Sequence, residues 1–486
     1  MTAIETHALP GLDELPLCVD LDGTLVYGDM LAEGMLSLSA DPGLALAIAR
    51  LPFTGRAAFK AHVGSRHEFD PAYLPYNEPL LDYLRAQKAL GRYLVLATAA
   101  HERVANAIAA HLGLFDEVIA SDSTRNLKGR AKGAALCARF GEHGFAYAGN
   151  DASDLAVWKV AGAAIPVNAS ARVARRAADL GLVETVMPGS GAPAALTLLK
   201  AMRPHQWVKN LLVFVPIFTA HAMGELHAWV AALLLFAAFC ATTSGIYLVN
   251  DATDIAADRR HPRKRKRPFA SGALPVPVGM AASPTLLTAG AGLAVASGAP
   301  WVILGYAAMS ISYSVKLKEQ PLVDVFMLAG LYTIRLFGGG VVTGHELSLW
   351  LLGFSAFLFL GLAILKRVAE LMSVSKENRG QSAARRGYGV SDLPMLQMMG
   401  CGSSFASAVV LALFVQSDAT ASHYASPVLL WAAVPLLLFW QCRLWLSTAR
   451  GYMLDDPIVY SAKDWVSWLA GGAVMALLLA AYSIKI

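Results

Sequence analysis

The feature that most constrains this chain is an abrupt change of composition near residue 202. Before that point charged residues are scattered through the sequence, and after it long apolar stretches alternate with short polar connections. The mean hydropathy of +0.48 arises mostly from the second part. Because 486 residues leave room for more than one domain, we expect a soluble domain followed by a membrane domain.

A helix needs about 20 mainly apolar residues to cross a membrane, and the second part contains nine apolar stretches close to that length. They lie near residues 207–223, 228–249, 281–297, 299–315, 321–343, 347–366, 393–416, 425–447 and 465–484. Connections without Lys or Arg alternate with connections that contain nearly all the positive charge. Since basic connections favour the cytoplasmic side, we predict a multi-pass inner-membrane protein with a cytoplasmic N-terminal domain and Ile486 outside.

Charge and cysteine content exclude several classes of protein. The net charge of +5 follows from the basic membrane loops, so it does not indicate binding to nucleic acid. The five cysteines are far apart and form no CxxC pair, which argues against a zinc site or a disulfide framework. The N-terminus has neither a basic start nor an apolar run, so no signal peptide is expected.

Three apolar segments of the first part are predicted strands that end in polar residues. The first, Leu17–Val19, precedes Asp20 and Asp22, and the second ends at Thr98. The third ends before Asn150, Asp151 and Asp154. Because functional loops of α/β sheets follow the carboxyl ends of strands, these residues are candidates for one site.

The DxDGT motif of Asp20 to Thr24 resembles the haloacid dehalogenase superfamily, whose members are mostly phosphatases. The resemblance implies a Rossmann-like α/β fold with a helical cap at about residues 29–88. It implies that Asp20 is the nucleophile and Asp22 the acid/base. Thr98 and Lys132 would bind phosphate, with Lys128 as a rival for the lysine. The implied Mg²⁺ ligands are Asp20, Asp22, Asn150, Asp151 and Asp154, where Asn150 replaces the usual first aspartate.

We place domain boundaries from these features and from a short linker rich in Pro, Gly and Ser. The hydrolase-like domain covers residues 1–187. Residues 188–201 form the linker and an interfacial helix, and residues 202–486 form an all-α membrane domain of nine transmembrane helices.

An acidic block at the end of the second predicted span is followed by a basic run. Asp251, Asp254 and Asp258 are spaced so that they share one face of a continuing helix. Three carboxylates beside a membrane repel one another, and a divalent cation would relieve that repulsion. Basic residues after them can hold phosphate charge. For Arg259, Arg260 and Arg265 we expect only a solvated loop.

The motif NDxxDxxxDxxHPxKxxRPxxSG, which starts at Asn250, resembles the decaprenyl-phosphate phosphoribosyltransferase branch of the UbiA superfamily of intramembrane prenyltransferases. The resemblance implies transfer of 5-phosphoribose from phosphoribosyl diphosphate to a polyprenyl phosphate. Asp251 and Asp254, supported by Asn250 and Asp258, would hold Mg²⁺ on the donor's diphosphate. The candidate substrate-binding residues are Lys209, Asn210, Asn250, Lys264, Arg267, Tyr313, Lys316, Asp324, Arg335 and Lys366.

One departure from the wider superfamily concerns the second acidic motif. Asp324 is followed four residues later by Leu328, so the DxxxD pair that binds another magnesium in aromatic-substrate enzymes is missing. Arg335 lies within a predicted span, where a cation is costly unless it faces a polar cavity. Pairing with Asp324 is possible, but we favour a role for Arg335 in binding a ligand phosphate.

The two domains together predict a bifunctional enzyme that uses Mg²⁺ in both. The membrane domain would make a phosphorylated lipid, and the hydrolase domain would remove its phosphate. One alternative is a transferase of prenyl diphosphates onto an aromatic or other acceptor, with an unrelated or regulatory phosphatase domain. A transporter or scaffold is a different class, but no matching halves are present in the sequence. A homo-oligomer remains possible.

Overall fold

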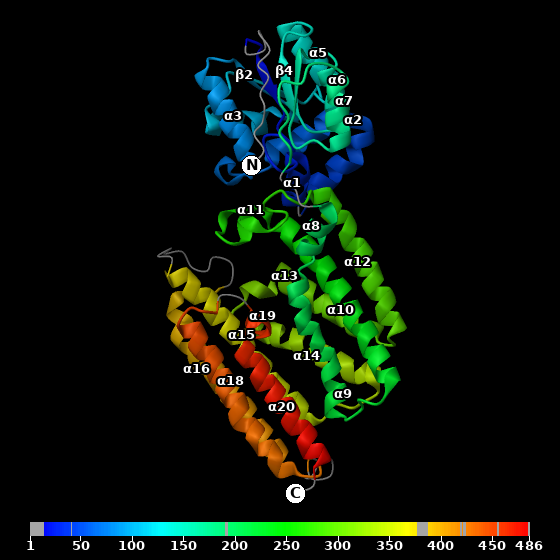
Figure 1. Cartoon of the computed structure of the whole chain (residues 1–486), viewed down its shortest axis with the longest axis vertical. Coiled ribbons are helices and arrows are strands. Elements are labelled where there is room, and N and C mark those ends of the chain that lie inside the picture. The colour runs from blue at the N-terminus through cyan, green and yellow to red at the C-terminus, as the bar shows by residue number, and fades with distance from the viewer. Residues whose placement is uncertain are drawn as a thin grey trace. The chain divides into compact units, whose positions relative to one another are not determined.

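A computed structural model of the chain describes residues 14–39, 41–189, 193–376, 387–417, 420, 424–453 and 456–484 (Figure 1). The terminal Ile486 and residues 190–192 of the predicted linker lie outside the described residues. The chain divides into two compact units. The first unit is Met1–Ala201 with Tyr247–Ala282, and the second is Met202–Ile246 with Ser283–Ile486.

A parallel five-stranded sheet forms the centre of the first unit, in the order β3-β2-β1-β4-β5. Its strands are β1 (Leu17–Val19), β2 (Leu94–His101), β3 (Glu117–Ser121), β4 (Ala146–Gly149) and β5 (Ala163–Pro166). In register, Val19 of β1 pairs with Leu96 of β2 and with Ala148 of β4. The strand order reverses beside β1, which is where open α/β sheets bind their ligands.

Helices cover both faces of this sheet (Figure 1). One core joins the strands to α3 (Glu78–Ala89) and α4 (Glu102–Leu112). The other joins them to α5 (Arg130–Phe140), α6 (Leu155–Trp158) and α7 (Ala171–Ala178). Apolar strands that are buried on both sides are typical of parallel sheets, and they confirm the predicted Rossmann-like fold.

The cap consists of α1 (Met30–Ser37) and α2 (Pro42–Arg66), which pack on each other through an apolar cluster that includes Phe59 and Val63. Asp29 caps the first helix and Asp41 the second, each by accepting backbone N–H groups. The predicted cap continued to residue 88, but Leu80, Leu81 and Leu84 of α3 belong to the core beneath the sheet. The structural cap is therefore shorter than the sequence predicts.

Four short helical segments complete the first unit. They are η1 (Pro71–Tyr73), η2 (Ala152–Asp154), α8 (Ala194–Ala201) and, from the acidic block, α11 (Ile255–Arg260). A fifth, the 3-10 helix η4 (Lys264–Lys266), follows α11. The acidic block is not one continuous helix, because α10 (Leu226–Thr253) ends before Asp254 and α11 starts after it.

Within the described residues, seven helices are long and apolar enough to cross a membrane. They are Leu226–Thr253, Val276–Ala296, Val323–Thr343, Leu349–Ser373, Val390–Val415, Pro427–Ala449 and Trp465–Ser483. These ranges contain α10, α12 (Val276–Ala296), α14 (Val323–Thr343), α15 (Leu349–Lys376), α16 (Leu393–Val415), η7 (Pro427–Ala432), α18 (Ala433–Ala449) and α20 (Trp465–Ser483). The chain is a multi-pass membrane protein.

The other two predicted spans form shorter helices. The first is divided into a 3-10 segment, η3 (Pro204–Phe214), and the five-residue α9 (Val215–Thr219), with Pro216 in the first turn of α9. The fourth is α13 (Pro300–Val315), whose 16 residues are fewer than the about 20 that a straight span requires. Short segments η5 (Leu317–Glu319), η6 (Val390–Asp392) and α19 (Pro457–Lys463) connect the long helices.

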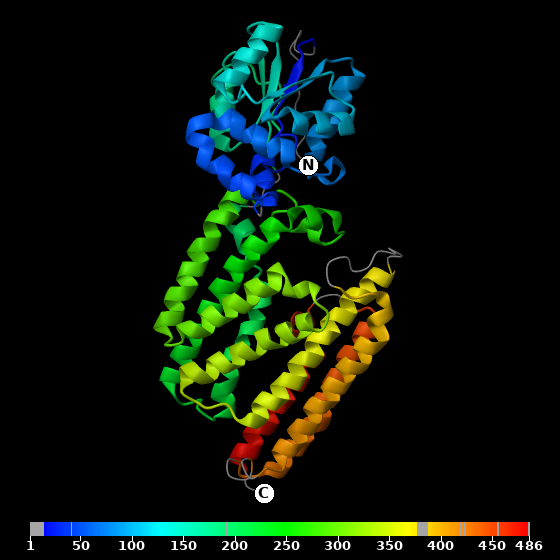
Figure 2. The ribbon, with the colours of Figure 1, turned by 180° about the vertical axis from the view of Figure 1, so that it is seen from behind.

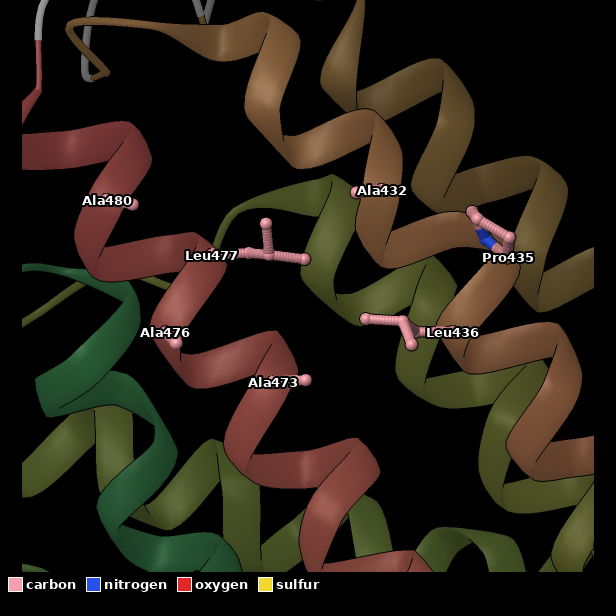
Figure 3. Close-up of a pocket in the computed structure, with 7 residues that line it drawn as sticks. All are labelled: Ala432, Pro435, Leu436, Ala473, Ala476, Leu477 and Ala480. Atoms are coloured by element: carbon pink, nitrogen blue, oxygen red, sulfur yellow. The ribbon is translucent and has the colours of Figure 1, made fainter.

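The C-terminal helices of the second unit lie side by side (Figure 2). Helix α16 packs against both α15 and α18, and α18 packs against α20. Between η7–α18 and α20 lies a groove of about 670 Å³ (Figure 3). Its lining is Ala432, Pro435, Leu436, Ala473, Ala476, Leu477 and Ala480. Because no polar side chain lines this groove, it offers apolar contact alone.

Candidate active sites

The carboxyl end of β1 places Asp20 beside a buried lysine. The Asp20 N–H donates to the carbonyl of Ala148 on β4 at 2.9 Å, which fixes the loop to the neighbouring strand. Lys132 of α5 is 2% exposed, and its Nζ donates to Asp20 Oδ1 at 2.7 Å. The rival Lys128 is exposed. Burial raises the pKa of Asp20, and the Lys132 ammonium opposes this effect.

A chain of hydrogen bonds connects Lys132 to the loop after β4. Lys132 Nζ donates to Tyr147 Oη at 2.6 Å, and that hydroxyl donates to Asp154 Oδ1 at 3.0 Å. The other oxygen of Asp154 accepts the N–H groups of Asn150 and Asp151, each at 2.9 Å. Asp154 therefore orders the loop as well as contributing charge. Tyr147 was not predicted, because a tyrosine within an apolar strand resembles a core residue.

Asp22 lies where the cap begins. Its Oδ1 accepts the N–H of Met30, the first residue of α1, at 2.9 Å. Burial, together with the charges of Asp29 and Asp20, raises the pKa of Asp22 to about 8. A carboxyl group with this pKa holds its proton at neutral pH, as a general acid must.

The remaining predicted residues of this site surround the same loop ends. Thr98 is fully buried on β2, and its Oγ1 accepts the N–H of Ala100 at 3.0 Å. The Asn150 side chain covers the turn at Gly23, where a Cβ would lie 2.0 Å from Asn150 Nδ2. Asp151 is exposed and caps η2. The structure therefore gathers the predicted residues at one edge of the sheet, with Asp151 at its periphery.

The acidic block of the first unit forms a second cluster. Arg267 Nη1 contacts Asp251 Oδ1 at 3.2 Å and Asp258 Oδ2 at 2.6 Å. The two carboxylates are 5% and 3% exposed, so two buried acids converge on one cation. Asp254 is half-buried at the break between α10 and α11, and Asn250 and Lys264 are also half-buried.

Both acidic clusters have the donor chemistry for Mg²⁺, a hard cation that prefers oxygen. Among the described residues, no three His, Cys, Asp or Glu side chains gather closely enough to form a metal site by themselves. Mg²⁺ commonly uses only one or two carboxylates and takes its other ligands from substrate phosphates and water. The Asp251–Asp258 pair, whose carboxylates converge on Arg267, fits that pattern.

Arg259, predicted to be solvated, is buried, so that prediction is wrong. It is 8% exposed, and its guanidinium forms a two-point ion pair with Glu33 of α1 at 2.8 and 2.7 Å. Its Nε donates to the carbonyl of Ala270 at 3.0 Å. Arg260 and Arg265 are exposed, as predicted.

The second unit contains a buried group of cations. Lys209 of η3 contacts Asp456 Oδ2 at 2.6 Å, and Lys366 of α15 contacts the same oxygen at 3.1 Å. Tyr332 of α14 donates to both oxygens of Asp456, at 3.3 and 3.2 Å. Two ammonium groups therefore share one carboxylate. Asp456 and Tyr332 were not among the predicted site residues.

Arg335 lies on α14 in the same unit. Its Nε donates to Asn210 Oδ1 at 2.7 Å, and its Nη2 donates to Tyr306 Oη at 3.2 Å. It also donates to the carbonyl of Leu331, and its guanidinium lies 4.7 Å from the ring centre of Tyr306. All these partners are neutral, and Arg335 is 4% exposed.

Asp324 is paired differently from Arg335. It is fully buried and forms an ion pair with Arg367 at 2.6 Å, while Tyr388 donates to its other oxygen at 2.6 Å. Tyr313 accepts from Arg367 at 3.3 Å. Asp324 and Tyr313 therefore belong to a buried network centred on Arg367. Lys316 is exposed at the end of α13.

The fold and these clusters define a multi-pass membrane protein with an N-terminal domain of the phosphatase-like α/β type. Residues 211–460 match the UbiA prenyltransferase family, and residues 17–159 match the haloacid dehalogenase-like hydrolases. Because the first match spans just over half of the chain, the chain belongs to the UbiA prenyltransferase family, with a hydrolase domain fused ahead of it.

Three relatives extend this assignment. The chain is 35% identical over 466 residues to the uncharacterized protein y4nM of Sinorhizobium fredii, covering 95% of this chain and 90% of that protein. It is 33% identical over 274 residues to the nodulation protein NoeC of Azorhizobium caulinodans, covering 55% and 88%. It is 39% identical over 181 residues to the decaprenyl-phosphate phosphoribosyltransferase of Corynebacterium glutamicum, covering 36% and 54%.

Proposed function

We propose that this protein transfers 5-phosphoribose from phosphoribosyl diphosphate to a polyprenyl phosphate, and that its hydrolase domain then removes the 5-phosphate. The related phosphoribosyltransferases support the first half of the proposal. The observation that carries it is the convergence of Lys209 and Lys366 on one oxygen of Asp456, together with Arg335 of the same unit, whose guanidinium donates to the neutral Asn210. A donor with a diphosphate at one end and a phosphate at the other needs several such cations.

In the transfer step, an oxygen of the lipid phosphate attacks the anomeric carbon of the donor. A new C–O bond forms, and the bond to the diphosphate breaks with its electrons on the leaving oxygen. Asp251 and Asp258 would hold Mg²⁺, and the chemistry that the ion would supply is neutralisation of charge on the departing diphosphate. Beside this pair, Arg267 and Lys264 would bind phosphate oxygens, and the candidate phosphate-binding cations of the second unit are Lys209, Lys366 and Arg335. The attacking phosphate is already anionic, so this step requires no general base.

In the second step, Asp20 attacks phosphorus and the bond from phosphorus to the ribose 5-oxygen breaks. Asp22 gives its proton to that oxygen, and afterwards it accepts a proton from the water that cleaves the aspartyl-phosphate. Lys132 neutralises charge on the Asp20 side, and Thr98 holds a phosphate oxygen. The product is a polyprenyl phosphate ribose, a pentose donor without the 5-phosphate.

The test is mass spectrometry of lipids made by the purified full chain from polyprenyl phosphate and phosphoribosyl diphosphate. We expect the wild type to make the dephosphorylated lipid, Asp20→Asn to accumulate the phosphorylated lipid, and Asp251→Asn to make neither. Glu102→Gln, at an exposed residue outside both sites, is the matched control and should resemble the wild type.

A parallel reaction offers a labelled prenyl diphosphate with aromatic acceptors in place of the ribose donor. Transfer of the prenyl group, without any product from phosphoribosyl diphosphate, would replace the proposal with the prenyl diphosphate alternative. An Asp20→Asn protein with an unchanged lipid profile would show that the hydrolase domain acts on something else. Release of phosphate from a generic aryl phosphate would exclude an inactive regulatory domain.

A further inference from the structure

A buried ion pair connects the phosphatase cap to the acidic block. Glu33 of α1 and Arg259 of α11 are 226 residues apart in the sequence, and both side chains are 6% exposed. Their two-point contact, at 2.7 and 2.8 Å, is the geometry in which Arg–carboxylate pairs are strongest. Removing one partner of such a pair leaves a buried charge without compensation.

On the phosphatase side, the ion pair lies against the catalytic loop. A Cβ at Gly28 would lie 2.7 Å from Glu33 Oε1 and 3.7 Å from Arg259 Nη2. The carbonyl of Gly28 accepts the N–H of Gly23, within the loop that starts at Asp20, at 3.1 Å. The helix that bears Glu33 also begins at Met30, whose N–H binds Asp22.

On the other side, the ion pair lies against the acidic cluster. Asp258, the neighbour of Arg259 on α11, shares Arg267 with Asp251. Arg259 Nε donates a hydrogen bond to the carbonyl of Ala270, two residues before Gly272. A Cβ at Gly272, which has φ of +73°, would lie 1.7 Å from the backbone oxygen of Tyr27.

The backbone at Gly272 therefore lies directly against the backbone at Tyr27, beside the ion pair. A side chain at position 272 would keep these two segments apart. Consecutive residues of α11 contact different sites, because Asp258 belongs to the acidic cluster and Arg259 to the phosphatase cap. A second, weaker contact follows, since the guanidinium of Arg260 lies 5.9 Å from the ring centre of Tyr73.

We propose that Glu33 and Arg259 are positioning residues that hold the phosphatase loop against the acidic block, so that the phosphatase acts on lipid made by the same chain. This proposal rests on the proposed function, and it adds that the phosphorylated lipid passes directly from the transferase to the phosphatase of the same chain. The phosphorylated lipid would be dephosphorylated before release, because intramolecular capture competes with diffusion into the membrane.

The test compares Glu33→Gln and Arg259→Gln with the wild type in full-length protein in lipid vesicles. With polyprenyl phosphate and phosphoribosyl diphosphate, we expect the wild type to release dephosphorylated lipid without a lag. Each variant should release phosphorylated lipid first, with about a tenfold fall in the initial ratio of dephosphorylated to phosphorylated product. Hydrolysis of p-nitrophenyl phosphate should change by less than about twofold, because neither residue touches the reacting groups.

The charge-exchanged protein, Glu33→Arg with Arg259→Glu, should recover much of the wild-type ratio. The matched controls are Glu102→Gln and Arg265→Gln, both at exposed residues, and they should show no lag. A purely structural role for the pair would lower both activities together. Equal losses on the soluble and the lipid substrate would therefore overturn the proposal.

Hydrogen exchange of residues 255–260 without substrate tests the contact separately from the reaction. We expect faster exchange in Glu33→Gln than in the wild type. Unchanged exchange would overturn the contact itself, and faster exchange with an unchanged product ratio would overturn the route. If even the wild type makes no lipid from phosphoribosyl diphosphate, the proposed function and the route both fail, and exchange still decides whether the contact exists.

Discussion

Two buried groups of charges in the second unit differ in how their charges are compensated. Arg367 is paired with both Asp324 and Glu370, whereas Lys209 and Lys366 share the single carboxylate of Asp456. A buried charge is costly unless it is paired, so the first group is complete as it stands. In the second, two ammonium groups contact the same carboxylate oxygen, which is the arrangement that we propose binds a phosphate. The comparison tests whether the first network serves the fold and the second serves a ligand.

The largest effect should come from breaking the complete pair. Asp324→Asn removes the charge that faces Arg367 and leaves a guanidinium that is 1% exposed with only the half-exposed Glu370. We expect a loss of about 3–5 kcal/mol in the free energy of unfolding. Denaturant unfolding of the detergent-solubilised protein measures this loss, and Lys463→Met, at an exposed lysine, is the control.

The double substitution Asp324→Leu with Arg367→Met tests the same idea from the other side. Replacing both members of a buried pair by apolar residues is often neutral, so this protein should be more stable than Asp324→Asn. An Asp324→Asn protein of wild-type stability that cannot transfer phosphoribose would instead place Asp324 in the substrate site, as the sequence predicts.

The next effect should be on transfer and not on stability. Lys209→Met removes one of the two ammonium groups that contact Asp456, while Lys366 still contacts this carboxylate at 3.1 Å. We expect kcat/KM for phosphoribosyl diphosphate to fall about 10²–10³-fold, because a preorganised cation at a phosphate is lost. Stability should fall less than in Asp324→Asn, because Lys366 still compensates the charge of Asp456. A large loss of stability with unchanged kcat/KM would erase the distinction between the two groups.

The sequence predicts best where the chemistry follows strand ends. Asp20 follows β1, Asn150 follows β4, and Thr98 lies within β2 between them in the chain. They gather at one edge of the sheet because the three strands are parallel. Seven of the nine predicted spans are long apolar helices among the described residues. The other two are shorter because proline and a 3-10 segment divide one, and because the other has 16 residues.

Ion pairs over long sequence distances could not be predicted. Arg259 belongs to a basic run that resembles any solvated loop, and only the fold brings Glu33 to it. Asp324 was assigned to substrate because its partner Arg367 lies on a different helix, α15. Composition and spacing indicate which residues are charged, but burial and pairing decide which charges need a ligand.

The third prediction concerns the pH dependence of stability that arises from the buried imidazole of His67. His67 is 5% exposed, and burial, with the nearby positive charges of Arg259 and Arg103, lowers its pKa to about 4. Its Nδ1 lies 3.0 Å from Ser37 Oγ. Because the pKa falls on folding from an unfolded value of about 6.5, the contribution of His67 to stability is present above pH 6.5 and is lost toward pH 4.

The loss for this one group should approach about 3 kcal/mol at pH 4, since each pKa unit corresponds to about 1.4 kcal/mol. Unfolding of the wild type and of His67→Asn, measured from pH 7 to pH 4, checks this. The variant should lose stability less steeply over that range. Equal slopes would show that folding does not lower the pKa of His67.

The smallest effect should come from Arg260, which tests whether burial or charge makes its neighbour important. Arg260 is exposed and contacts the Tyr73 ring at 5.9 Å, whereas Arg259 is buried against Glu33. Arg260→Gln should cost less than about 1 kcal/mol in unfolding free energy, as exposed cation–π contacts do. Arg259→Gln should cost several times more, because it leaves Glu33 buried and unpaired. Both are measured by denaturant unfolding in the same detergent, with Arg265→Gln as the exposed control. Equal losses for Arg259→Gln and Arg260→Gln would mean that the positive charge of α11, and not the buried pair, stabilises this segment.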